Sequence, residues 1–195
     1  MKNTTILLLI LVTFSAYSQE RTKFLYTEFA DKSVTISPFY TAFGSHFDPA
    51  VTVGAGMNYR QKMNRTFFQT IQLTGYTTEI TGNGVTLTTN IGYRYGRSSG
   101  LFAEGMIGIG GSAFFPSRES FSQDTDGAYI PVKPLHAAAA LPIDLILGYG
   151  SGTFALYMKY RFMVIGPYAE ALPVVPHSII GIGIRYNVTQ NGKTF

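Results

Sequence analysis

A strict alternation of apolar and polar residues is the feature that most restricts the fold of this chain. The last such run, 178–188, shows it most clearly. One face of this run carries Ile180, Ile182, Ile184, Tyr186 and Val188. The other face carries Gly181, Gly183, Arg185 and Asn187. A period of two is that of a β-strand, so the run predicts a strand whose apolar face points either into a soluble core or outward to lipid.

The same alternation recurs along the chain, and we predict a strand at each recurrence. The eight predicted strands are 33–43, 51–60, 66–76, 85–95, 101–114, 136–149, 153–165 and 178–188. Pro38 and Pro142 lack the backbone N–H that a strand donates, so each is expected at a bulge or at a gap in the pairing. Alternating runs of roughly ten residues, separated by turn residues, are typical of an antiparallel transmembrane β-barrel.

The connections between these runs differ in length in a regular way. The short links are 61–65, 96–100 and 150–152. The longer links are 77–84, 115–135 and 166–177. Outer-membrane barrels have short periplasmic turns and longer extracellular loops. An even number of strands also places both ends of the barrel on the short-turn side, so the two patterns agree.

The first residues have the features of a secretory signal. Lys2 supplies a positive charge, 6–12 an apolar stretch, and 16–18 a small-residue cleavage site before Gln19. The alternative, a buried N-terminal strand, does not explain why these features occur in this order. We therefore predict a signal peptide over 1–18, a periplasmic lead-in over 19–32, an eight-stranded all-β barrel over 33–188 and a tail over 189–195.

Charged residues are scarce, and on the predicted strands they share a face with the glycines. They form 13% of the chain, about half of the usual share in soluble domains. An eight-stranded barrel has room inside only for packed side chains or one small ligand, and glycines suit that narrow interior better than an open surface. We therefore place the polar face inside. The predicted lipid-facing residues are Ile180, Ile182, Ile184, Tyr186, Phe154, Leu156, Tyr160, Phe162, Leu145 and Leu147.

Charge inside a barrel has to be compensated, which predicts ion pairs in the lumen. The residues assigned to this lumenal network are Arg60, Arg94, Glu104, Asp144, Lys159, Arg161 and Arg185. We predict that the two acids, Glu104 and Asp144, pair with the bases on neighbouring strands. Such a network plugs the barrel and fixes its fold. The alternative is a selective conduit or an anion site.

Other chemistry finds little support in the residues. The absence of cysteine excludes disulfides, thiol catalysis and cysteine-bound metal. The histidines are His46, His136 and His177. They are far apart and are predicted as loop or interfacial residues, so we expect no metal site. Adjacent residues on a strand point to opposite faces, so His177 and Ser178 make a poor base–nucleophile pair. We predict no catalytic residue and no cofactor, and a net charge of +4 without a basic cluster gives no reason to expect nucleic acid.

The eight runs, the loop asymmetry and the ending 181–188 resemble the small outer-membrane β-barrel proteins of Gram-negative bacteria, the group that includes the outer-membrane protein A barrel and the opacity proteins. The ending is similar to their C-terminal assembly signal, although 189–193 intervene before Thr194 and Phe195. The signal that ends at Ser18 and Gln19 resembles that of Bacteroidetes-type secreted proteins. The resemblance implies a porin-like monomer in the outer membrane that contacts lipid and, during biogenesis, the barrel-assembly machinery.

Three functions remain open at this point, and we adopt the first. It is a non-enzymatic outer-membrane barrel whose extracellular loops carry structural, adhesive or binding roles. The second is a lipid-modifying barrel enzyme, a hydrolase or acyltransferase, which requires His136 or His177 within hydrogen-bond reach of a serine and an acid at the rim. The third is a soluble lipocalin-like carrier, which would be extracted without detergent.

Overall fold

The structure is a computed structural model, and it describes residues 22–33, 47–78, 82–115, 121–123, 129–131, 136–150, 152–167 and 174–188. The predicted signal peptide and the C-terminal tail lie outside these residues. The same holds for Pro38, for His46 and for nearly all of the predicted first strand, 33–43. In the described part of the chain, no helix has the length and apolarity needed to cross a membrane.

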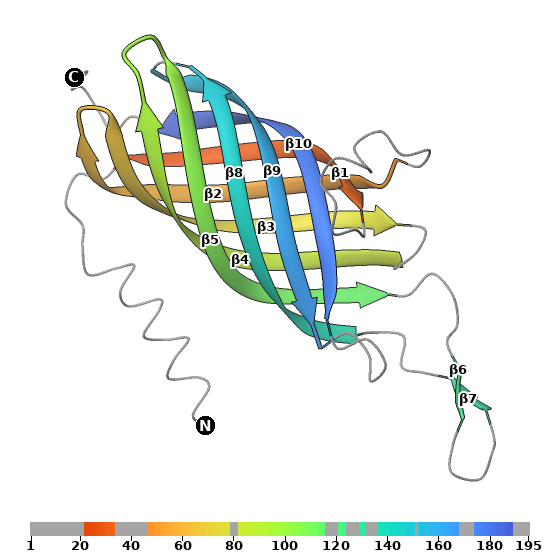
Figure 1. The fold of residues 1–195 in the computed structure, drawn as a ribbon. Helices are drawn as coiled ribbons and strands as arrows, with labels where there is room; N and C mark the ends of the chain where they lie inside the picture. Colours follow the sequence, from red (N-terminus) through yellow and green to blue (C-terminus); the bar gives the residue numbers. More distant parts are fainter. Residues whose placement is uncertain are drawn as a thin grey trace, which may run out of the picture.

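Eight long antiparallel strands close into one barrel (Figure 1). They are β1 (Lys23–Ser33), β2 (Pro49–Lys62), β3 (Arg65–Thr78), β4 (Gly82–Gly96), β5 (Leu101–Phe115), β8 (His136–Tyr149), β9 (Phe154–Gly166) and β10 (Val175–Val188). Each strand pairs with the next barrel strand in the chain, and β10 pairs with β1 to close the cylinder. The predicted eight-stranded up-and-down barrel is therefore confirmed.

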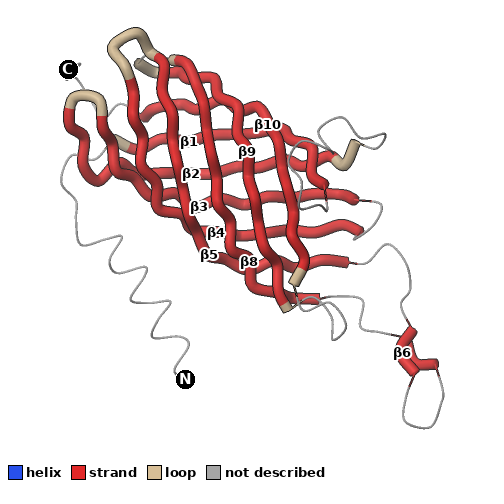
Figure 2. Tube along the Cα trace, in the orientation of Figure 1, coloured by secondary structure: helices blue, strands red, loops and turns tan. Residues whose placement is uncertain are grey.

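The two ends of the barrel carry different connections. At one end, which we call the short-turn end, a two-residue turn at 63–64 joins β2 to β3, and tight turns join β4 to β5 and β8 to β9. The opposite end, the long-loop end, carries the connections that follow β1, β3, β5 and β9. The connection after β5 contains a separate small hairpin of β6 (Phe121–Gln123) and β7 (Tyr129–Pro131), which stands away from the barrel (Figures 1 and 2).

The first barrel strand lies about ten residues earlier than predicted. The segment 19–32 was expected to be a lead-in, but Lys23–Ser33 forms β1 and pairs along its length with both β10 and β2. The polarity pattern of β1 does not identify it as a barrel strand, because the aromatic Phe24 and Tyr26 point inward while the charged Lys23 is exposed. Its side chains alternate between inside and outside, but apolar and polar residues do not.

Two local irregularities adjust the ladders. A β-bulge between Asn58 and Arg60 shifts the register of β2 against β3, so that Arg60 pairs with the outward-facing Phe67. The prediction that Arg60 lies in the lumen is therefore wrong, and its side chain is exposed. The β5–β8 ladder is interrupted between Ile107 and Gly110, opposite Pro142. This interruption confirms the pairing gap expected at that proline.

Every barrel strand contributes exposed apolar side chains to the outer wall. Ile182 is 68% exposed, and Leu147 and Leu156 are each 64% exposed. Of the other predicted lipid-facing residues, those fully on this wall are Leu145, Phe154, Ile184 and Tyr186, and those half-buried in it are Tyr160, Phe162 and Ile180. A wall of this kind would be an extended apolar patch in water, whereas in a bilayer it contacts lipid. A soluble carrier requires the opposite arrangement.

Inward-facing side chains fill the barrel in three layers. Toward the short-turn end lie Phe24, Tyr26, Phe68, Phe102, Met106, Ile146, Ala155 and Tyr157. Toward the long-loop end lie Ala30, Ala50, Tyr76, Phe114, Ala138, Ala140, Met163, Ile165 and Ile179, which we call the outer apolar cluster. Most of the buried charged and amide groups, among them Glu28, Gln72, Asp144 and Arg161, occupy the level between them. The described side chains thus fill most of the lumen.

At Gly110 of β5 the backbone of β4 lies too close to leave room for a side chain, and a substitution tests this contact. A Cβ added there would collide with the carbonyl oxygen of Leu87 and lie 2.7 Å from the Cα of Thr88. Relief requires a shift of the β4–β5 ladder, so Gly110→Ala is expected to lower the free energy of unfolding by about 1–3 kcal/mol.

The control for this substitution lies on the same strand. An added Cβ at Gly105 has nothing within 4 Å, so Gly105→Ala is expected to change stability by at most about 0.5 kcal/mol. Urea unfolding from lipid vesicles, followed by circular dichroism, measures both variants. Equal effects at Gly105 and Gly110 would contradict the assignment of their strand faces.

Candidate functional site in the lumen

Two ion pairs in the lumen join residues that are direct cross-strand partners. Asp144 lies opposite Arg161 in the β8–β9 ladder, and Glu104 lies opposite Arg94 in the β4–β5 ladder. Opposite residues on one face of a sheet have Cβ atoms about 4.5–5.5 Å apart, so their charged ends meet without any change in the backbone. Each pair therefore follows from the register of its own hairpin.

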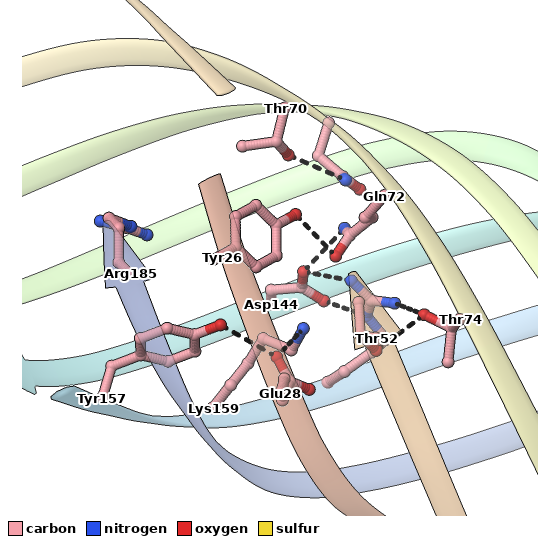
Figure 3. A network of polar contacts seen from close by, with 12 residues as sticks. Tyr26, Glu28, Thr52, Thr70, Gln72, Thr74, Asp144, Tyr157, Lys159 and Arg185 are labelled. Carbon is pink, nitrogen blue, oxygen red and sulfur yellow. Dashed lines mark hydrogen bonds and ion pairs between the residues drawn. The ribbon is translucent and has the colours of Figure 1, made fainter. Parts of the chain in front are cut away.

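The Asp144–Arg161 pair lies at the centre of the barrel. Nε and Nη2 of Arg161 donate to the two carboxylate oxygens at 2.6 and 2.7 Å. Gln72 approaches the same carboxylate with its amide nitrogen at 3.5 Å, and its amide oxygen accepts a hydrogen bond of 3.1 Å from Tyr26 (Figure 3). The paired side chains have almost no exposed surface, so this bidentate contact is shielded from water. Together with Gln72 and Tyr26 it connects four strands.

A third ion pair reaches across an intervening strand. Nζ of Lys159 on β9 lies 2.5 Å from Oε2 of Glu28 on β1, and Tyr157 donates to the same oxygen at 3.5 Å (Figure 3). Strand β10 runs between them and presents Gly181 and Gly183 at this level. An added Cβ at Gly183 would collide with the Tyr157 ring, so these glycines leave the space that the ion pair needs.

A third group closes the short-turn end of the lumen. Glu104 accepts two hydrogen bonds from Arg185, at 2.5 and 2.8 Å, and one from Arg94 at 2.5 Å. The guanidinium of Arg185 lies 4.6 Å from the centroid of the Phe24 ring, and that of Arg94 lies 4.9 Å from the centroid of the Phe102 ring. Aromatic faces attract such cations, so this cluster combines ion pairing with aromatic packing.

Six of the seven residues assigned to the lumenal network lie in the interior, and Arg60 does not. Those six are Arg94, Glu104, Asp144, Lys159, Arg161 and Arg185. Sequence reasoning missed Glu28, because β1 was taken for a lead-in, and it did not anticipate the contributions of Tyr26, Gln72 and Tyr157. Arg161, Asp144 and Lys159 are each 1% exposed, so the described side chains leave almost no surface open to water at their level of the lumen.

A lipid-modifying enzyme requires a histidine hydrogen-bonded to a serine or an acid at the rim, and among the described residues no such bond involves His136 or His177. His136 stacks on Phe114 with ring centroids 5.4 Å apart. His177 was predicted as a loop or interfacial residue, but β10 begins at Val175, so His177 lies within that strand and is buried. The hydroxyl of Ser178 lies 3.3 Å from that of Tyr160, on the opposite face of β10 from His177. Among the described residues, no group of three acidic or histidine side chains could hold a metal ion.

Comparison with known proteins identifies the fold. No protein-family model matches the chain, and no curated protein sequence matches it. The crystal structure of neisserial surface protein A superposes with a TM-score of 0.54 at 13% identity, covering 86% of this chain and 97% of that one. The outer-membrane enzyme PagL superposes with a TM-score of 0.51 at 10% identity, covering 85% and 99%. At these identities the similarity concerns the fold alone.

The fold, the apolar wall and the enclosed polar interior together define the class of protein. The chain is a small eight-stranded β-barrel of the outer-membrane type, with its strands crossing the bilayer. We therefore assign it to the outer membrane. The middle and the short-turn end of its interior are filled by a network of ion pairs.

Proposed function

We propose that this barrel is a non-enzymatic, monomeric outer-membrane protein that holds extracellular loops for structural, adhesive or binding roles. The observation that carries the proposal is the sealed lumen, in which the ion pairs of Asp144 and Glu28 have almost no exposed surface. A barrel of this kind offers no path for solutes. The parts left to meet partners outside the cell are the loops at the long-loop end.

The length of the connection between β5 and β8 supports this role. Its small hairpin, β6 and β7, forms a sheet of its own and is no part of the barrel. The barrel strands are therefore complete without it.

We also propose that barrel-assembly machinery inserts the protein. The strand pattern supports a relationship to the group of the outer-membrane protein A barrel and the opacity proteins, and the signal that ends at Ser18 and Gln19 supports a Bacteroidetes-type source.

A permeability measurement tests the sealed lumen. Liposomes that contain the purified protein are expected to exclude a small sugar such as arabinose as fully as empty liposomes do, because the ion pairs leave no aqueous path. Liposomes with a general porin serve as the positive control for swelling. Swelling at a rate close to that control would show that the protein is a conduit.

Loop replacement tests the proposed role of the long connection. Exchange of 116–135 for a short Gly-Ser turn is expected to preserve heat-modifiable gel migration, because the barrel ladders do not include β6 or β7. The same exchange is expected to abolish adhesion of protein-displaying cells to a matrix-coated surface. Unchanged adhesion would contradict a role for this loop, whereas loss of migration would show that the barrel itself needs it.

A further inference from the structure

Lys32 is a buried cation in the lumen. Its side chain is fully enclosed at the long-loop end of β1, and its Nζ has no hydrogen-bond partner among the described residues. The other fully buried lysine and arginine side chains among the described residues are paired, namely Lys159 with Glu28, Arg161 with Asp144 and Arg185 with Glu104. An isolated buried ammonium is costly, so the arrangement calls for an anion.

The groups around Lys32 compensate only part of this charge. Nζ lies 3.6 Å from the centroid of the Tyr76 ring, a cation–π contact. Asp48 on the neighbouring chain segment has a favourable electrostatic effect on Lys32 without a hydrogen bond to its Nζ, and its backbone carbonyl accepts from the Lys32 amide at 2.8 Å. Neither contact provides a hydrogen-bond acceptor for the Lys32 ammonium.

A second nitrogen without a partner lies on the adjacent strand. Lys32 pairs with Ile179 in the β1–β10 ladder, and His177 is the next inward residue of β10 toward the long-loop end. His177 is 1% exposed, and its Nδ1 has no hydrogen-bond partner in the described part of the chain. An ammonium and an imidazole thus point into the lumen from neighbouring strands, and both can donate to one acceptor.

The surroundings of these two nitrogens are mostly apolar and compact. The outer apolar cluster supplies four alanines, Ala30, Ala50, Ala138 and Ala140, together with Phe114, Met163, Ile165 and Ile179. A phosphate or sulfate would bring more charge and more acceptors than the two nitrogens can satisfy. A single carboxylate on a compact apolar group matches both the donors and the wall.

We propose that Lys32 and His177 form a binding site for the carboxylate of a small, largely apolar organic acid at the long-loop end of the lumen. The apolar part of the acid contacts the outer apolar cluster. This site lies apart from the ion-pair network, and it does not depend on the adhesive role proposed for the loops. The acid would therefore bind inside the barrel, separately from any partner of the loops.

Isothermal titration of the detergent-solubilised full chain with benzoate tests the site, and benzamide serves as the neutral isostere. Benzoate is expected to bind saturably, whereas benzamide is not. Lys32→Met is expected to weaken benzoate binding at least tenfold, and Lys32→Arg to retain it. Lys23→Met is the matched control, because Lys23 lies exposed at the other end of the same strand, and it is expected to leave binding unchanged.

Stability provides a second readout that does not require a calorimetric signal. Benzoate is expected to raise the melting temperature of the wild type, because a ligand that binds the folded state stabilises it, and to leave that of Lys32→Met unchanged. Should Lys32→Met fail to fold, His177→Leu and Lys32→Arg decide the question, with binding lost in the first and kept in the second. Absence of saturable benzoate binding, or equal affinity in the wild type and the Lys32 and His177 variants, would overturn the proposal.

Discussion

Replacement of Asp144 by asparagine is expected to lower the free energy of unfolding by about 3–5 kcal/mol. The substitution keeps the shape of the side chain and removes the charge that accepts two hydrogen bonds from Arg161. Arg161 is 1% exposed, so it would remain as a buried charge without compensation. Urea titration of the protein folded into lipid vesicles, followed by far-ultraviolet circular dichroism, measures the loss.

Replacement of arginine by methionine at two positions, one buried and one exposed, provides the control. Arg161→Met is expected to destabilise the barrel strongly, because it leaves the Asp144 carboxylate unpaired, whereas Arg60→Met at the exposed end of β2 is expected to change stability by at most about 0.5 kcal/mol. The double variant of Asp144→Asn with Arg161→Met is expected to recover most of the loss, since neither of these two positions then carries a buried charge. Equal losses for the two arginine variants would contradict a sealed interior at Arg161.

A proline at Thr27 is expected to prevent closure of the barrel. Thr27 pairs with Ile184 of β10 on one side and with Val53 of β2 on the other, so it lies in the middle of the closing strand. Proline removes a ladder donor and its ring disturbs the neighbouring backbone, at a cost of about 3 kcal/mol or more. Loss of heat-modifiable gel migration, which reports an intact barrel, is the expected result.

A matched variant separates the backbone from the side chain at this position. The Thr27 side chain lies on the outer wall, so Thr27→Val is expected to keep the heat-modifiable migration and to add apolar surface facing lipid. Normal migration of Thr27→Pro would contradict the assignment of Lys23–Ser33 as the strand that closes the cylinder.

Most barrel strands could be predicted from the sequence because their outward faces are apolar and their inward faces polar. β9 and β10 show this most clearly, with Leu156 and Ile182 outside and Arg161 and Arg185 inside. β1 departs from this pattern, since its inward-facing Phe24 is apolar and packs against Arg185 at the short-turn end. Polarity alone cannot distinguish such a strand from a lead-in. The pairing partners identify it.

The contacts in the lumen were predictable only where one hairpin contains them. The register of β8 and β9 brings Asp144 opposite Arg161, whereas Glu28 and Lys159 come from strands separated by β10. Arg60 was misplaced because one extra residue in β2 reverses the faces of the residues that follow it. A bulge of this kind leaves no signal in the alternation pattern.

Spin-label accessibility at Ile182 tests the central claim, that the apolar wall faces lipid, most directly. The chain has no cysteine, so Ile182→Cys provides a single attachment site at a residue that is 68% exposed. In protein reconstituted into lipid vesicles, the label is expected to collide far more often with oxygen, which concentrates in the bilayer, than with a water-soluble nickel chelate. Frequent collision with the nickel chelate and little with oxygen would contradict the membrane-spanning barrel.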